Sequence, residues 1–342
     1  MNNDISDVPS VRVGHAQSDA LVSGVTVCLF EAPATAGVAV LGGAAAARDT
    51  ENLDPSGAVD HVDAITLSGG SGFGLDAAGG VQAWLRAAGR GFPVGGGHVP
   101  IVPGAIIFDL ANGGDKNWDR FAPYRDLGFE ATEAAASGPV PLGSVGAGLG
   151  ATTVNFKGGI GSASAVTSFG ARVGALMVVN ALGSATIGDG PHFWAAGLEE
   201  HAEFGGLGLG QEISSAARQP RWKGGPASAT VSPATTIGVV ATDVTLSKAE
   251  ARRVAIAGHD GFARSLRLTH ALFDGDMLFA ASTRQRPAPQ SPAEAIELGS
   301  VAADCVARAI ARGVFHAATP GFGYSGPPAW CDVHSPTSAS TE

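Results

Sequence analysis

Residues 232–243 read Ser-Pro-Ala-Thr-Thr-Ile-Gly-Val-Val-Ala-Thr-Asp, and this stretch is the most specific signal in the sequence. It joins a segment of small, uncharged residues to a short apolar run, Ile237–Ala241, which is typical of a buried strand. Thr235 and Thr236 stand at the junction. Because β-branched residues are common at the start of a strand, this pair alone establishes no function.

The chain that follows predicts a helix and a second strand. Ser247-Lys248-Ala249-Glu250 matches a capping box and predicts a helix to about Leu268. The apolar run Met277–Ala281 predicts the second strand. Ser291-Pro292-Ala293-Glu294 predicts a further helix to about Arg312, with Pro at its first position. A strand, helix and strand of this length predict a mixed α/β fold.

The remaining segments fit the same class and show no repeat. Residues 62–67 predict a strand, which a glycine-rich turn at 68–72 links to a helix over 75–88. Between residues 143 and 185, β-branched and small residues alternate with glycines, which favours strands. Residues 218–234 read as an exposed connector, and residues 320–342 as an irregular tail. We expect a single domain over residues 1–342.

Composition limits the function classes. The 342 residues carry 21 Lys and Arg against 31 Asp and Glu, a net charge of −10, which disfavours binding to nucleic acid or anionic membranes. Only 15% of residues are charged and 45% are hydrophobic, which favours a homo-oligomer with covered faces. The first residues lack a secretion-signal pattern and the apolar runs are too short to span a membrane, so we expect a cytoplasmic protein.

Other motifs are weak. Residues 146–151, Gly-Ala-Gly-Leu-Gly-Ala, match a dinucleotide-binding pattern, but residues 139–143 are a poor strand and residues 152–154 are a poor helix start. The histidines and the three widely spaced cysteines lack the spacing of a metal site. We therefore expect neither an organic cofactor nor a metal.

A resemblance to a known family is carried by several motifs in the same order along nearly the whole chain. The motifs are Val11–His15, Leu67–Ala78, Val99–Pro103 with Ile106–Leu110, Val145–Gly148, Gly158–Ser164, the Thr235 segment and Phe273–Ala280. With these motifs the chain resembles the P1 family of peptidases, which contains self-processing aminopeptidases, β-peptidyl aminopeptidases and nylon-oligomer hydrolases.

The resemblance implies a fold and a reaction. Such proteins fold as a four-layer αββα sandwich, and the precursor cuts its own chain just before a Ser or Thr. By the match, that residue is Thr235, which would give fragments 1–234 and 235–342. The side-chain hydroxyl attacks the preceding carbonyl, and the freed α-amine, with a pKa of about 7.7–8.0, then serves as the base for its own hydroxyl.

The resemblance also implies supporting residues. Asn180 matches the asparagine that stabilises the oxyanion, and Asp274 and Asp276 match the pair that orients the new α-amine. The lysine of the nylon-oligomer hydrolases aligns with Asn155 or, after a two-residue shift, with Lys157.

The sequence therefore predicts a hydrolase of small peptides or peptide-like amides with an N-terminal nucleophile, assembled as a tetramer of processed units. Phe73 replaces a tyrosine of the nylon-oligomer hydrolases, and no acid nearer than Asp76 is placed to bind a substrate amine, so strict aminopeptidase specificity is not implied. The alternatives are an acyltransferase like ornithine acetyltransferase, an endo-type amide-oligomer hydrolase, and a non-catalytic nucleotide-binding or scaffold protein.

Overall fold

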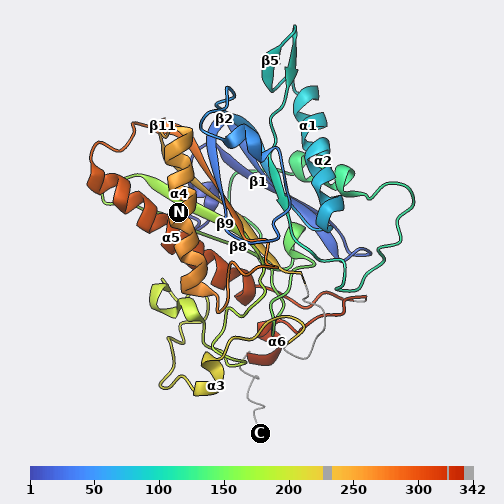
Figure 1. The fold of residues 1–342 in the computed structure, drawn as a ribbon, viewed down its shortest axis with the longest axis vertical. Coiled ribbons are helices and arrows are strands. Elements are labelled where there is room, and N and C mark those ends of the chain that lie inside the picture. Colours follow the sequence, from blue (N-terminus) through green and yellow to red (C-terminus); the bar gives the residue numbers. More distant parts are fainter. Residues whose placement is uncertain (226–232, 322, 335–342) are drawn as a thin grey trace.

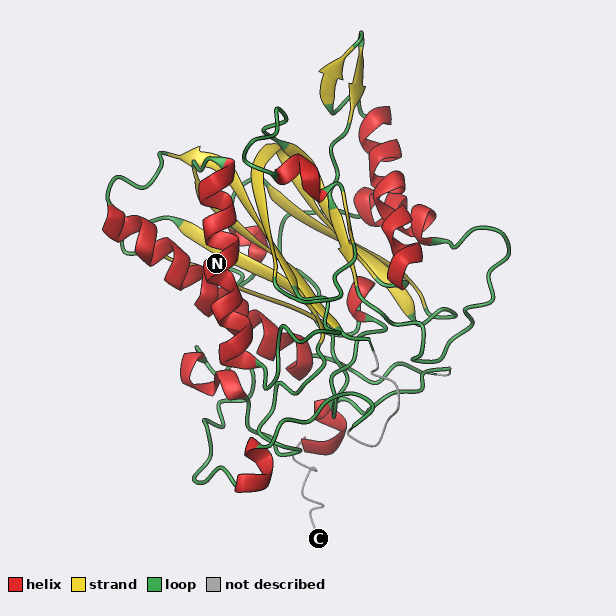
Figure 2. Ribbon diagram, in the orientation of Figure 1, coloured by secondary structure: helices red, strands yellow, loops and turns green. Residues whose placement is uncertain are grey.

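The computed structural model describes residues 1–225, 233–321 and 323–334, whose helices and strands are arranged in layers (Figure 1, Figure 2). The strands are β1 (Val11–Ser18), β2 (Ser23–Val40), β3 (Ala47–Arg48), β4 (Val62–Ser68), β5 (Phe92–Val94), β6 (Gly97–Val99), β7 (Gly104–Ile106), β8 (Ile160–Val166), β9 (Arg172–Asn180), β10 (Thr235–Val244) and β11 (Met277–Arg286). The α-helices are α1 (Ala77–Ala87), α2 (Tyr124–Glu133), α3 (Ser215–Arg218), α4 (Lys248–Ser265), α5 (Pro292–Phe315) and α6 (Trp330–His334). Short 3₁₀ helices lie at Ile5–Asp7, Thr50–Leu53, Ser71–Asp76, Gly146–Gly148 and Trp194–Leu198.

The long strand β2 links two sheets. The hydrogen-bonded order is β3, β7, β4, β2, β11, β10, β9, β8, and β1 pairs with β2 beside this path. The first half of β2 pairs with β1 and β4, whereas its second half pairs with β11. One strand of 18 residues thus belongs to both sheets.

Three apolar clusters separate the layers. The middle cluster lies between the sheets, and one outer cluster packs β8–β11 against α4 and α5. The other outer cluster packs β2 and β4 against α1 and α2. Along β10, Ile237 and Val239 belong to the middle cluster and Val240 to the cluster under α4 and α5, as the period of two requires. The expected four-layer αββα sandwich is confirmed.

The predicted strand, helix and strand are present. Ser247 caps α4 with both hydrogen bonds of the capping box, and Ser291 caps α5 by accepting from the backbone N–H of Glu294. The strands β10 and β11 run parallel, with Ile237 opposite Met277, so α4 is the crossover between them. This connection brings the start of β10 next to the loop that precedes β11.

Two segments differ from expectation, and a third agrees with it. Trp222 and Lys223, in the connector predicted to be exposed, are partly buried, and residues 226–232 of it lie outside the described part. The predicted tail contains the short helix α6, which packs Trp330 against Phe193. The glycine-rich segment at 146–151 forms a 3₁₀ turn between irregular stretches, so among described residues 139–159 it lacks the strand and helix of a dinucleotide site.

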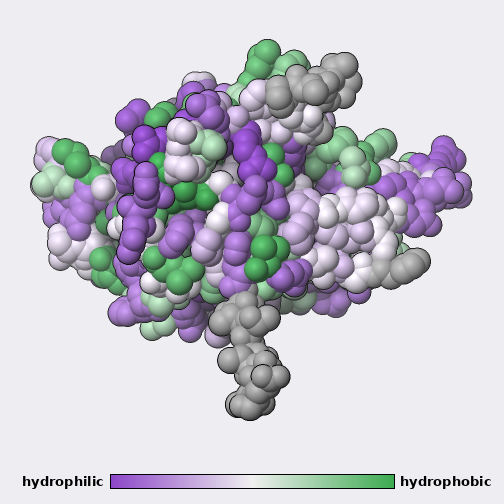
Figure 3. All heavy atoms as spheres, turned by 90° about the horizontal axis from the view of Figure 1, so that it is seen from below, coloured by the Kyte–Doolittle hydropathy of each residue, from purple (hydrophilic) through white to green (hydrophobic). Residues whose placement is uncertain are grey.

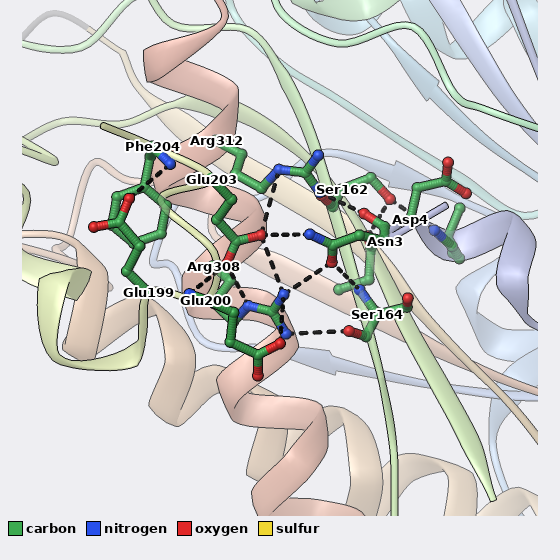
Figure 4. A network of polar contacts seen from close by, with 12 residues as sticks. Asn3, Asp4, Ser162, Ser164, Glu199, Glu200, Glu203, Phe204, Arg308 and Arg312 are labelled. Atoms are coloured by element: carbon green, nitrogen blue, oxygen red, sulfur yellow. Dashed lines mark hydrogen bonds and ion pairs between the residues drawn. The ribbon is translucent and has the colours of Figure 1, made fainter. Parts of the chain in front are cut away.

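A buried ionic cluster fastens the N-terminus to α5 (Figure 4). We call Asn3, Glu203, Arg308 and Arg312 the N-terminal cluster. Arg308 binds both carboxylate oxygens of Glu203, with Nε 2.5 Å from Oε1, and donates to Asn3 Oδ1 at 2.9 Å. Asn3 in turn donates to Glu203 Oε2 at 2.6 Å. The first residues are therefore part of the packed structure.

The surface mixes polar and apolar groups. In Figure 3, hydrophobic residues lie in separate groups among hydrophilic ones on the face shown. Large exposed side chains include Phe121, Leu272 and Ile296, each more than 70% exposed. Within the described residues, no helix has the length and apolar character that crossing a membrane requires.

Candidate active site

Thr235 is the first residue of β10 and lies directly opposite Asn180 of the antiparallel strand β9. Its side chain is buried, and its Oγ1 donates to the carbonyl oxygen of Ala234 at 2.5 Å. The backbone N–H of Gly275 donates to the same oxygen at 2.9 Å. The hydroxyl therefore touches the carbonyl group that precedes it, and that carbonyl is already polarised by an N–H donor.

Gly275 approaches Thr235 closely because it has no side chain. A Cβ atom at this position would lie 2.4 Å from Thr235 Oγ1, nearer than real contacts. Ala234 and Asp274 form a parallel bridge, which keeps the two segments in register. The glycine in the Asp274-Gly275-Asp276 motif is therefore needed to let the loop before β11 reach the threonine.

Asp276 is held by three donors from the surrounding backbone and a histidine. Its Oδ1 accepts from the backbone N–H of Thr236 at 2.9 Å. Its Oδ2 accepts from the backbone N–H of His270 at 2.9 Å and lies 2.9 Å from His270 Nδ1. With these partners, Asp276 is fixed beside the start of β10 as an acceptor.

Asp274 is the second carboxyl group of the site. Burial and the neighbouring charge of Asp276 raise the pKa of Asp274 to about 8, and its carboxyl group is hydrogen-bonded to that of Asp276. Two adjacent buried carboxylates cannot both ionise easily, and this favours the protonated form of Asp274. The site thus holds a proton donor next to the backbone that carries Thr235.

The side-chain oxygen of Asn180 accepts two short hydrogen bonds. Oδ1 accepts from the backbone N–H of Thr152 at 3.0 Å and from Lys223 Nζ at 3.0 Å. Its Nδ2 donates to the carbonyl oxygen of Phe108 at 3.1 Å. Burial lowers the pKa of Lys223 to about 7, against the attraction of Asp274.

Lys157 is buried and has hydrogen-bond partners other than the residues around Thr235. Its Nζ donates to the carbonyl oxygens of Gly148, Ala151 and Gly158 at 2.7–2.8 Å, and burial lowers its pKa to about 7. Asn155 donates instead to Thr186 and Gly188. The structure therefore brings Thr235, Asn180, Asp274 and Asp276 together, whereas the hydrogen bonds of Lys157 hold the loop behind Asn180.

Lys223 is a residue that the sequence analysis missed. It lies in a segment without periodicity, which the sequence assigns to a connector. The rarity of lysine is a signal that each lysine has a specific contact, because the chain has only four lysines and its other cationic residues are arginines. Each lysine donates to backbone carbonyls inside the fold, namely Lys116, Lys157, Lys223 and Lys248.

A cavity of about 520 Å³ lies beside residues that contact Asn180. Its wall includes Phe108 and Thr152, which bind Asn180, and also Lys223 and Pro233. Phe73 is 54% exposed and packs edge-on against Trp118, outside the lining of this cavity. The cavity is large enough for a small peptide or amide.

Comparison with known proteins identifies the family of this chain. Residues 3–325 match peptidase family S58, so the chain belongs to that family and is a hydrolytic enzyme of the aminopeptidase and amidohydrolase kind. An uncharacterized aminopeptidase of Mycobacterium tuberculosis is 43% identical over 334 residues, covering 92% of this chain and 94% of the relative. A 6-aminohexanoate-oligomer endohydrolase of Paenarthrobacter ureafaciens is 29% identical and covers 84% of this chain and 76% of the relative.

Solved structures share the fold. A β-aminopeptidase of Burkholderia sp. superposes with a TM-score of 0.66 at 24% identity, covering 97% of this chain and 92% of the other. An L-aminopeptidase and D-Ala-esterase/amidase of Ochrobactrum anthropi gives a TM-score of 0.65 at 21% identity, covering 92% of this chain and 86% of the other. The resemblance found in the motifs is thereby confirmed at the level of family and fold.

Proposed function

We propose that this protein cuts its own chain between Ala234 and Thr235 and then uses the new N-terminal threonine to hydrolyse small peptides or peptide-like amides. The observation that carries the proposal is the contact of Thr235 Oγ1 with the Ala234 carbonyl oxygen, 2.5 Å away, on a carbonyl that also accepts from Gly275 N–H. An N–H donor aimed at the reacting oxygen stabilises the charge that develops there.

Self-cleavage needs no outside reagent except water. The hydroxyl oxygen of Thr235 attacks the Ala234 carbonyl carbon, the C–N bond breaks, and the hydroxyl proton ends on the nitrogen that becomes the α-amine. Water then hydrolyses the ester, leaving a carboxylate on Ala234 and a free Thr235. Asp274, which is bridged to Ala234 and has a raised pKa, is the group that would support proton transfer to that nitrogen.

In the mature enzyme, the α-amine of Thr235 takes the proton of its own hydroxyl during attack on a substrate amide. Asn180 supplies an N–H group to the tetrahedral oxyanion, and Asp276 orients the amine through the fixed backbone around it. The higher identity to the aminopeptidase relative than to the oligomer endohydrolase favours substrates with a free amine.

The hydrolysis assay uses amino-acid p-nitroanilides, a β-alanine-led peptide and an aminohexanoate oligomer. Thr235→Ala should turn over none of them, and Thr235→Ser should retain part of the activity, because serine keeps a hydroxyl at the same position. Thr236→Val is the matched control, since the buried Thr236 hydroxyl has no hydrogen-bond partner among the described residues. Turnover by Thr235→Ala equal to that of the wild type would place the nucleophile elsewhere.

We also infer that the processed units form a homo-oligomer. Low charge and large exposed apolar side chains such as Leu272 and Ile296 support this inference. Light scattering should give a mass several times 34.0 kDa, and a mass near 34 kDa at all concentrations would contradict the inference.

A further inference from the structure

Lys223 reaches the candidate active site from the segment that leads to the proposed cleavage point. Its Nζ lies 3.0 Å from Asn180 Oδ1 and 3.2 Å from the backbone oxygen of the same residue. Its backbone N–H donates to the carbonyl oxygen of Leu182 at 3.1 Å. Both ends of the lysine are therefore tied to the chain that leaves β9.

The contacts of Asn180 fix which way its amide faces. Its Oδ1 accepts from Lys223 Nζ and from the backbone N–H of Thr152, and a backbone N–H group can only donate. The nitrogen must therefore lie on the opposite side, where one N–H binds the Phe108 carbonyl and the second is left for another acceptor. Asn180 lies directly opposite Thr235 in the register of β9 and β10, so the two side chains lie on the same face of the sheet.

We propose that Lys223 is a positioning residue, which holds the Asn180 amide with its nitrogen toward the carbonyl that Thr235 attacks. This inference rests on the proposed function and goes beyond it. Without Lys223, only Thr152 would donate to Oδ1, through its backbone N–H and a longer contact from its hydroxyl, and the amide could rotate to present an oxygen to the developing oxyanion. An oxygen there would repel the negative charge instead of stabilising it.

Lys157 cannot take this role in the arrangement observed. Its three N–H donors are used by Gly148, Ala151 and Gly158, and none reaches Asn180. Lys223 also stays with the larger fragment if the bond before Thr235 is cut, because it precedes that bond in the chain. Its anchor on Leu182 does not depend on the bond, so the positioning role extends to the mature enzyme.

A double-mutant cycle tests the inference. Wild type, Lys223→Met, Asn180→Ala and the double variant are made by cell-free translation, and self-cleavage is followed on denaturing gels. Lys223→Met should slow cleavage about tenfold to a hundredfold, the effect of one hydrogen bond to a charged group. In the Asn180→Ala background the same change should cost less than about twofold, because the residue it positions is gone.

Arg221→Met is the matched control, because Arg221 lies two residues away and its exposed side chain binds Asp189 instead of the site. It should cleave at the wild-type rate. An equal loss from Lys223→Met in both backgrounds, or no loss in either, would overturn the positioning role while leaving self-cleavage intact. Absence of cleavage in the wild type would instead overturn the proposed function and, with it, this inference.

A second readout covers the case in which Asn180→Ala cleaves too slowly to measure. Lys223→Ala leaves space for a small amine, so added ethylammonium should restore at least part of the lost cleavage rate. Tetramethylammonium, which has the charge but no N–H donor, should restore none. Failure of ethylammonium to raise the rate, or equal rescue by both ions, would contradict a hydrogen bond from Lys223 to Asn180.

Discussion

Two buried polar clusters of this protein are built on opposite principles. In the N-terminal cluster, charges are matched: burial acts to raise the pKa of Glu203, but hydrogen bonds from Arg308 and Asn3 outweigh it and hold the pKa below its ordinary value. Around Thr235, Asp274 and Asp276 are neighbours, and the pKa of Asp274 rises to about 8 through burial and its like-charged neighbour.

The difference separates a cluster of matched charges from the one that we propose carries the chemistry. Matched, hydrogen-bonded charges hold the N-terminus against α5, as Figure 4 shows. A carboxyl group and a lysine with displaced pKa values beside a hydroxyl cost stability, and such groups concentrate at functional sites. Variants around Thr235 should therefore change mainly the reaction rates, and variants in the N-terminal cluster mainly the melting temperature.

The largest effect on rate without loss of the fold is expected at Asn180. Asn180→Ala should leave a folded protein but reduce the rates of self-cleavage and substrate turnover by roughly 10² to 10³, the usual loss for one oxyanion donor. Denaturing gels and p-nitroanilide assays give the rates, and thermal unfolding checks the fold. A rate within threefold of the wild type would remove Asn180 from the mechanism.

Glu203 should show the reverse behaviour. Glu203→Gln leaves the buried Arg308 poorly paired, and breaking a buried ion pair typically costs about 3–5 kcal/mol, so the melting temperature should fall by several degrees. Glu200→Gln is the control, because Glu200 contacts the same arginine but is 55% exposed. At temperatures where the variant is folded, self-cleavage should be unchanged; a large loss of rate would mean that the two clusters are coupled.

A smaller effect is expected at Asp274, and it depends on pH. Because folding raises the pKa of Asp274 from 3.8 to about 8, stability is lost as pH rises through this range. Asp274→Asn cannot ionise, so in an uncleaved Thr235→Ala background its melting temperature should match the parent near pH 4 and exceed it at pH 7. Asp189→Asn, at an exposed position, is the control. Parallel curves of melting temperature against pH for the parent and Asp274→Asn would contradict the raised pKa of Asp274.

Local signals predicted much of the fold. Ser247 and Glu250 form the capping box that their spacing indicates, and helix α4 ends at Ser265, close to the predicted Leu268. The apolar runs at Ile237 and Met277 lie within β10 and β11. These features depend on neighbours a few residues apart, which a sequence displays directly.

The site was harder to predict because it depends on contacts across the fold. Thr235, Asn180, Asp274 and Asp276 are predicted as site residues only through the family resemblance, since spacing alone does not show that β9 and the loop before β11 meet at Thr235. Lys223 was missed because its segment has no periodicity and its partner, Asn180, is 43 residues away. The helix α6 in the predicted tail was missed because it is only five residues long.

The most direct test of the account is the intact mass and N-terminal sequence of the purified wild-type chain. The account predicts two fragments, of 234 and 108 residues, and the smaller should begin Thr-Thr-Ile-Gly. The Thr235→Ala chain should keep the mass of the whole precursor. A single 342-residue wild-type chain after long incubation, or a smaller fragment that begins at another residue, would contradict the assignment of Thr235 as the nucleophile.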